Sequence, residues 1–226
     1  MKKGKFIVIE GTDGSGKATQ TALLKERLQK EGIKVTTDDY PHYDEFWGNL
    51  VGRMLMKEFG DPFNISPYLT VLPYIIDEYV GSLKIRQQVE NGEFVLSNRY
   101  FTANVHQVAK LTGRAQSKFR KWLWEAGWNQ LGIYKPDLVI VLMVDPKIVM
   151  KLIKKKSSRS YTKGKKRDAA EEKFLHQQAS AKEYKRMCKT NDNWLMIKCC
   201  NQKREILSPE EIHKKVYDLL RKKRVI

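Results

Sequence analysis

Short apolar runs alternate along this chain with longer segments in which apolar residues recur at helical spacing. Strands are predicted at residues 5–10, 33–38, 93–97, 138–144 and 194–198. The run at 138–144 is apolar at every position, which is typical of a central parallel strand buried on both faces. Strands that alternate with helices form a parallel sheet covered by those helices. The pattern therefore predicts an α/β fold.

Helices are predicted at residues 17–31, 45–58, 67–90, 116–130 and 169–188, after the third strand through residue 111, and from residue 208 onward. We expect Pro73 and Gly81 to interrupt the helix at 67–90. Pro146 is expected to open a helix that runs into a lysine-rich segment at 154–167. Ser208 and Glu211 predict a capping box at the start of the last helix.

Length and charge exclude few of the possible functions. The 226 residues suit one α/β domain, and 41% of them are hydrophobic. The formal net charge is +17, which attracts polyanions such as nucleotides, nucleic acid or acidic lipid. A basic surface that only keeps the protein in solution explains the same number, so charge alone identifies no ligand.

Targeting and redox signals predict a cytoplasmic protein. No segment approaches the roughly 20 apolar residues that span a bilayer, and the run at 6–9 is too short for a signal-peptide core. The cysteines, Cys188, Cys199 and Cys200, are odd in number, which argues against a secreted disulfide framework. They also lack the CxxC spacing of a structural zinc site.

A phosphate-binding loop is the most specific motif. Residues 11–17 read GTDGSGK, which matches GxxxxGK directly between a predicted strand and a predicted helix. The loop's N–H groups and the helix dipole would bind phosphates, and Lys17 would reach the terminal phosphates of ATP. The candidate ATP-binding residues are Gly11, Thr12, Asp13, Gly14, Ser15, Gly16, Lys17, Ala18 and Thr19.

One position of this loop departs from the pattern. A Ser or Thr that holds Mg²⁺ is expected after the lysine, but the residue is Ala18. Thr19 carries a hydroxyl, but about 100° further round the helix, where it faces elsewhere.

The loop and several later blocks resemble the thymidylate kinase family. The loop has an acid inside it and Thr-Gln after it, and the later blocks follow in the family's order: Tyr40-Pro41, residues 72–77, Ser97-Asn98-Arg99-Tyr100, His106-Gln107 and residues 135–138. The resemblance covers nearly the whole chain. It implies a P-loop fold with a five-stranded parallel sheet, a lid at about 154–167, a homodimer, Mg²⁺ as cofactor, and transfer of the ATP γ-phosphoryl group to dTMP.

Chemistry and resemblance together suggest roles for single residues. Arg99 is a candidate clamp for the acceptor phosphate, because a guanidinium binds phosphate in a bidentate way. Asp13 would accept a hydrogen bond from the acceptor's sugar, as in the family, or only brace the loop. Tyr74 would stack on the acceptor base or pack in the core. Tyr40, Pro41 and Gln107 complete the acceptor site by resemblance.

The predicted lid supplies further candidates. The loop has no arginine between Asp13 and Lys17, and relatives of that kind bring lid arginines to the transferring phosphate. Arg159 and Arg167 are therefore catalytic candidates beside Lys17 and Arg99, with Lys163 and Lys166 behind them. A solvated run of charges is the competing interpretation.

Two further departures affect the metal and the base. Asn98 stands where the family has a metal-associated Asp, so Mg²⁺ would be held mainly by ATP and waters, with Glu10, Asp13 or Asn98 in outer contact. Glu78 stands where the family has an Arg beside thymine, and a carboxylate can only accept hydrogen bonds. Either Glu78 selects another base, or it points away and Arg86 or Gln107 serves.

These departures leave other functions open. One is a kinase for another nucleotide or a (deoxy)nucleoside, and a second is a nucleotide-binding protein with weak catalysis. A nucleic-acid-binding module is a third, but the basic residues are spread along the chain and no such motif is found, so we do not expect a nucleic-acid partner. The tryptophans at 122, 124 and 128 are interpreted as core or dimer packing.

Overall fold

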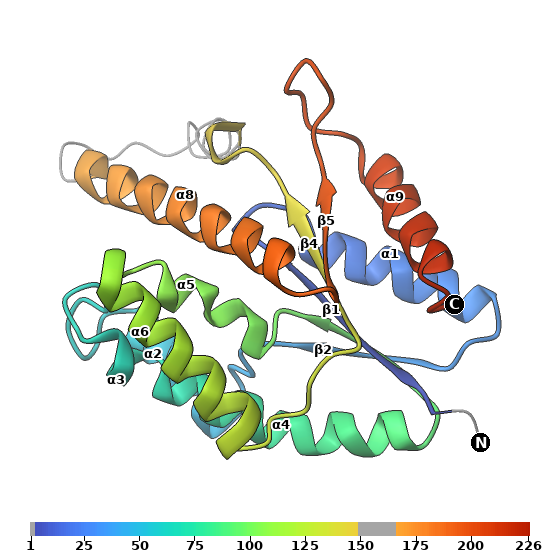
Figure 1. Ribbon diagram of the computed structural model, residues 1–226, viewed down its shortest axis with the longest axis horizontal. Coiled ribbons are helices and arrows are strands. Elements are labelled where there is room, and N and C mark those ends of the chain that lie inside the picture. Colours follow the sequence, from blue (N-terminus) through green and yellow to red (C-terminus); the bar gives the residue numbers. More distant parts are fainter. Residues whose placement is uncertain (1–2, 149–165) are drawn as a thin grey trace.

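A parallel sheet forms the middle layer of the structure (Figure 1). The computed structural model describes residues 3–148 and 166–226, with side chains in the second segment from residue 174 onward. The sheet has five strands in the order β2-β3-β1-β4-β5, and every neighbouring pair is parallel. The strands are β1 Lys5–Gly11, β2 Val35–Asp39, β3 Phe94–Asn98, β4 Leu138–Met143 and β5 Trp194–Lys198. The predicted α/β class is confirmed.

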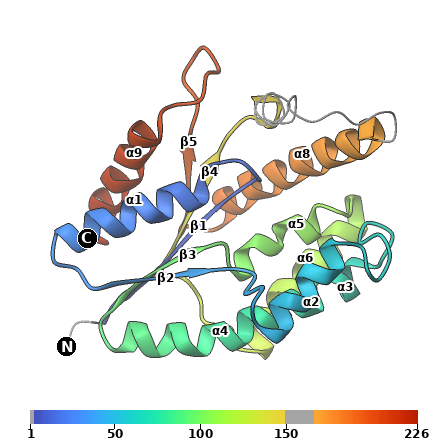
Figure 2. The same ribbon diagram turned by 180° about the vertical axis from the view of Figure 1, so that it is seen from behind.

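Helices cover both faces of the sheet. They are α1 Lys17–Lys30, α2 Phe46–Leu55, α3 Pro67–Thr70, α4 Leu72–Glu90, α5 Val105–Val108, α6 Gly113–Trp124, α8 Lys166–Thr190 and α9 Pro209–Lys222. Figures 1 and 2 show α1 and α9 on one face and α4, α5, α6 and α8 on the other. Among the described residues, none of these helices combines the length and apolarity that crossing a membrane requires.

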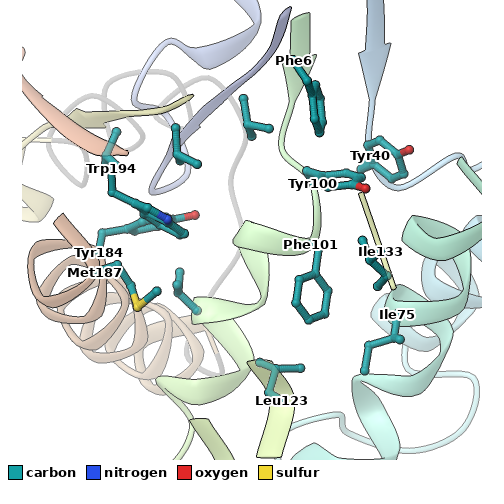
Figure 3. Packing of buried hydrophobic residues seen from close by; sticks show 14 of the residues in the cluster. Phe6, Tyr40, Ile75, Tyr100, Phe101, Leu123, Ile133, Tyr184, Met187 and Trp194 are labelled. Carbon is teal, nitrogen blue, oxygen red and sulfur yellow. The ribbon is translucent and has the colours of Figure 1, made fainter. Parts of the chain in front are cut away.

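The two faces of β1 belong to two separate cores, because successive side chains of a strand point to opposite sides. Phe6 and Val8 join the core under α4, α6 and α8, whereas Ile7 and Ile9 join the core under α1 and α9. Figure 3 shows the first core, in which the Tyr100 ring lies between those of Phe6 and Tyr40. The ring centroids are 4.9 Å and 5.2 Å from that of Tyr100.

Trp124 and Trp128 pack against the first core, as predicted. The rings of Trp124 and Trp128 lie 5.2 Å and 4.5 Å from that of Phe101, within the first core. Trp122 lies nearer the surface and packs against Tyr68, at 4.9 Å between ring centroids.

The segment at 67–90 differs from prediction at one of its two expected breaks. Pro73 does mark a boundary, because it lies in the first turn of α4, where a missing N–H costs nothing. Gly81 does not interrupt α4, so that expectation was wrong. The residue serves close packing instead, since a Cβ at Gly81 would lie 2.0 Å from the Tyr40 hydroxyl.

Other boundaries follow from local contacts. The segment after β3 is a 3-10 turn, Phe101–Asn104, followed by α5, rather than one continuous helix. After α6 the chain forms a π-helical turn, Glu125–Gln130. The predicted capping box is confirmed, because Ser208 Oγ accepts from Glu211 N at 3.1 Å and Glu211 Oε2 accepts from Ser208 N at 2.8 Å. The predicted lid at 154–167 falls almost entirely outside the described residues.

Candidate active site

The phosphate-binding loop connects the end of β1 to the start of α1. Gly11 and Gly16 have φ angles of 146° and 89°, which favour glycine. A Cβ at Gly11 would also lie 2.5 Å from the Leu142 carbonyl oxygen. Lys17 Nζ donates to the carbonyls of Gly11 and Thr12, each at 3.1 Å. The ammonium group of Lys17 therefore lies against the backbone of the loop.

The interior of the loop is polar and buried. Lys17 is only 7% exposed, and burial, with Arg99 close by, lowers the pKa of its ammonium group to about 8, while Glu10 and Asp13 oppose this. The hydroxyls of Thr12 and Ser15 are buried without a hydrogen-bond partner among the described residues. Buried hydroxyls of this kind are suited to phosphate oxygens. Ala18 and Thr19 are exposed on α1.

Asp13 joins the loop to two distant elements. Its Oδ1 accepts a short hydrogen bond from Arg99 Nη2. Its Oδ2 accepts from Gln177 Nε2 at 2.9 Å, and its backbone N donates to Gln177 Oε1 at 3.2 Å. The loop, the end of β3 and α8 therefore meet at one carboxylate, which supports the bracing role considered for Asp13.

Glu10 lies near the end of β1, directly before the loop, and is fully buried. Its carboxylate accepts from Thr102 Oγ1 at 2.6 Å and from the Tyr184 hydroxyl at 2.7 Å. Burial raises the pKa of Glu10, and Arg99 partly opposes that. Because each carboxylate oxygen of Glu10 already accepts a hydrogen bond from a hydroxyl, Glu10 needs no metal ion as a partner.

An acid that the sequence analysis missed lies beside Asn98. Asp39 is the last residue of β2 and is in register with Asn98, the last residue of β3. Asn98 Nδ2 donates to Asp39 Oδ1 at 2.9 Å, and Asn98 Oδ1 is buried without a partner among the described residues. A carboxylate and an amide oxygen at the carboxyl edge of a parallel sheet suit a hard divalent cation. The signal was the second acid of the Asp38-Asp39 pair at a strand end.

A cavity of about 700 Å³ opens beside Asp13 and Arg99. That volume lies within the usual range for sites that hold small ligands. Every predicted acceptor-site residue lines it: Asp13, Tyr40, Pro41, Tyr74, Glu78, Arg99 and Gln107. The sequence analysis missed several others, among them Asp39, Tyr43, Asn104, His106, Lys110, His176 and Gln177.

A charged triad supports the wall of the cavity behind Tyr40 and Pro41. His42 Nε2 lies 2.8 Å from Asp38 Oδ1, and His42 Nδ1 lies 3.1 Å from Asp77 Oδ1. These hydrogen bonds raise the pKa of His42 to about 10, so its ring is a cation at neutral pH. Glu45 also comes within 4.8 Å of His42 and Asp77. Because each ring nitrogen of the protonated His42 donates to a carboxylate, this ion cluster needs no metal ion to explain it.

Glu78 and Gln107, the two residues predicted near the acceptor base, both line the cavity. Glu78 faces the cavity and accepts from Asn104 Nδ2, while Gln107 Oε1 accepts from Thr70 Oγ1 at 3.1 Å. Arg86 lies elsewhere, because its Nη2 donates to the Gly132 carbonyl at 3.1 Å. The alternative in which Glu78 points away and Arg86 replaces it is therefore wrong.

The lid candidates are only indirectly placed. Arg159 and Lys163 lie outside the described residues. Arg167 and Lys166 belong to the first turn of α8, but their side chains also lie outside the described part. The same helix contributes Gln177 to the cavity wall.

Known proteins of one family are similar to this chain. The family model described as thymidylate kinase matches residues 9–209. A probable thymidylate kinase of Thermococcus onnurineus is 35% identical over 162 residues, which are 69% of this chain and 74% of that protein. A thymidylate kinase of Caldicellulosiruptor saccharolyticus is 31% identical, over 67% of this chain and 70% of that protein. The solved structure of thymidylate kinase from Candida albicans has the same fold, with a TM-score of 0.71 at 18% identity, over 99% of this chain and 93% of that one.

Proposed function

The chain belongs to the thymidylate kinase family, and on that premise we propose that the loop around Lys17 binds ATP while Arg99 and its cavity bind dTMP. The reaction is the ATP-dependent phosphorylation of dTMP to dTDP. The observation that carries the assignment of sites is the Arg99–Asp13 contact. It brings the acceptor cavity directly against the phosphate-binding loop, so that a donor and an acceptor phosphate would meet between them.

The chemistry asked of these residues is charge neutralisation and alignment. Two anionic substrates repel each other, and phosphoryl transfer depends mainly on positioning and electrostatic stabilisation. Lys17 and the loop amides would hold the ATP phosphates. The Arg99 guanidinium, 23% exposed at its side chain, would clamp the dTMP phosphate. Asp13 would keep Arg99 in place and remain close to the acceptor's sugar.

A lid would complete the charge balance. The loop offers Lys17 but no arginine, and α8, which lines the cavity through Gln177, begins at Lys166. We propose that Arg159 and Arg167 contact the phosphoryl group during its transfer and neutralise its charge.

ATP-dependent kinases of this family use a divalent metal, and Mg²⁺ is our proposal. Asp39 and Asn98 fit it, since one contributes a carboxylate and the other an unpartnered amide oxygen. The ion would supply positive charge to the phosphates. Asp39 then compensates for the negative charge that Asn98 lacks.

A second copy of the chain is the proposed partner. Leu72, Tyr79 and Leu83 lie on one face of α4 at spacings of seven and four residues and are exposed. Phe46, Leu55 and Met56, on or next to α2, are exposed as well. Figures 1 and 2 show α4 at the outer boundary of the molecule. An apolar face of this kind marks a protein interface.

The location of the protein in the cytoplasm stays a prediction.

Release of ADP from ATP and Mg²⁺ tests this function, with dTMP, dUMP, dCMP and dGMP as acceptors. We expect dTMP to be used best. Lys17→Ala should lower kcat/KM by about 100-fold or more, because it removes charge stabilisation of the transition state. Lys215→Ala, on α9 at the far face of the sheet, is the matched control and should leave turnover unchanged. Full turnover by Lys17→Ala would refute the assignment of the ATP site.

A further inference from the structure

A buried acid lines the acceptor cavity. Glu78 lines the cavity and is only 3% exposed. It lies one helical turn after Tyr74 on α4, so the two side chains share the helix face that is turned to the cavity. Glu78 is therefore available to a base that binds in the cavity.

The hydrogen bonds of Glu78 are too few for a carboxylate. Asn104 Nδ2 lies 3.1 Å and 2.8 Å from its two oxygens. The same Nδ2 donates to the Phe101 carbonyl at 3.1 Å, which fixes this atom as the amide nitrogen and uses one of its two hydrogens. One hydrogen is left for Glu78. Among the described residues, none forms an ion pair with it.

The surroundings also disfavour a negative charge. Burial raises the pKa of Glu78 well above its usual range; the Asn104 hydrogen bond opposes this, while Asp77 and Glu10 add to it. The titratable groups around it are Asp77 and Tyr74 on α4, Glu10 on β1, Tyr40 after β2 and Tyr100 after β3. The nearby cations are already paired, His42 with Asp77 and Arg99 with Asp13. A neutral acid is the stable form in such a site.

A neutral carboxyl group presents an O–H donor beside a C=O acceptor. The imide edge of thymine or uracil presents the complementary pair, an N3–H donor beside the O4 acceptor. A carboxylate would instead place an acceptor against O4. We propose that Glu78 binds the base of dTMP as a neutral acid, donating to O4 and accepting from N3–H. The inference rests on the proposed function, in which this cavity receives dTMP.

Calorimetric binding of dTMP and of an analogue tests this contact. The analogue is the 5-methylpyrimidin-2-one nucleotide, which lacks N3–H and O4 and adds no bulk. We expect the wild-type protein to prefer dTMP by about 10-fold or more. Glu78→Gln, which keeps a donor beside an acceptor, should preserve most of this preference. Glu78→Met should abolish it. Glu93→Gln changes a buried acid at the opposite edge of the sheet and should leave the preference unchanged.

The same titrations repeated from pH 6.5 to 9 test the protonation state. The dTMP affinity of the wild-type protein relative to Glu78→Gln should stay level or fall as the pH rises, because deprotonation removes the donor to O4. A relative affinity that rises with pH would overturn the inference. Equal preference for dTMP in all variants would do so as well, and would mean that Glu78 only supports Asn104. Failure of the proposed function is distinct, because then the wild-type protein shows no dTMP-dependent ADP release.

Discussion

Arg99 is the residue on which donor and acceptor sites converge. Its φ of 67° places a non-glycine residue in the left-handed region directly after β3, a conformation that costs about 1–3 kcal/mol and recurs at functional sites. The backbone is held there because Arg99 N donates to the Ile9 carbonyl at 3.1 Å and Ser97 Oγ donates to the Arg99 carbonyl. This backbone conformation directs the Arg99 side chain toward Asp13. The strain therefore positions the guanidinium group for its proposed role.

Asn98, the neighbouring residue, gives a prediction about the metal. Asn98→Asp would put two carboxylates side by side at the ends of β2 and β3, where Asn98 now donates to Asp39. Without metal the repulsion should lower the melting temperature, and with Mg²⁺ the added charge should bind the ion more tightly. We expect the Mg²⁺ concentration for half-maximal ADP release to fall several-fold.

The control for this experiment is Asn201→Asp, which makes the same charge change in the loop between β5 and α9. Asn201 Nδ2 donates to Glu205 Oε2 at 2.8 Å, so this variant reproduces the repulsion between carboxylates. It should leave the Mg²⁺ concentration for half-maximal ADP release unchanged. An Mg²⁺ titration that is identical in Asn98→Asp and in the wild-type protein would exclude position 98 from the metal site.

At the scale of elements, the loop between β2 and α2 is fastened to α4 by the Asp38–His42–Asp77 triad. This positions Tyr40 and Pro41 along the cavity. The triad stabilises the fold only while His42 is protonated. The pKa of His42 is about 10 in the folded state and about 6.5 in an unfolded chain. Its contribution is therefore complete below about pH 6.5 and is lost as the pH rises through about 10.

His42→Gln should accordingly destabilise the protein most at low pH. Loss of a charged hydrogen bond costs about 1.5–3 kcal/mol, which lowers the melting temperature by about 3–10 °C for a chain of this size. We expect the difference from the wild-type protein to shrink between pH 6.5 and 10 in thermal unfolding. His213→Gln is the control, because burial lowers the pKa of His213 and gives no such trend. A constant difference for His42→Gln would contradict the triad's role.

Local patterns predicted most elements and the phosphate-binding loop. Three examples are the GxxxxGK motif, the Ser208 cap and the apolar run at 138–144. Each depends on interactions among a few consecutive residues, so the sequence shows it directly. Asp39 was missed because its importance comes from register with Asn98 across the sheet. Gln177 was missed for a similar reason, since its contact with Asp13 joins positions 164 residues apart. The misjudged role of Gly81 also depends on a distant residue, Tyr40.

At the scale of the whole molecule, the apolar face of α4 predicts self-association. The interface should form a homodimer at micromolar concentration, because exposed Leu83 and its neighbours gain from burial. Val80→Glu combined with Leu83→Glu should give a monomer in light scattering coupled to size exclusion. Ile206→Glu, an exposed apolar position before α9, is the matched control and should leave the dimer intact. A double variant that remains dimeric would place the interface elsewhere.

The carboxylate shared by Arg99 and Gln177 also has a consequence for how such a sequence changes over time. A substitution at position 13 removes a hydrogen-bond partner from both Arg99 and Gln177, whereas a substitution at position 99 or 177 removes a partner from Asp13 alone. Related chains that carry a different residue at position 13 should therefore differ at position 177 as well. Laboratory evolution that starts from a position-13 variant should recover fitness first through changes in α8.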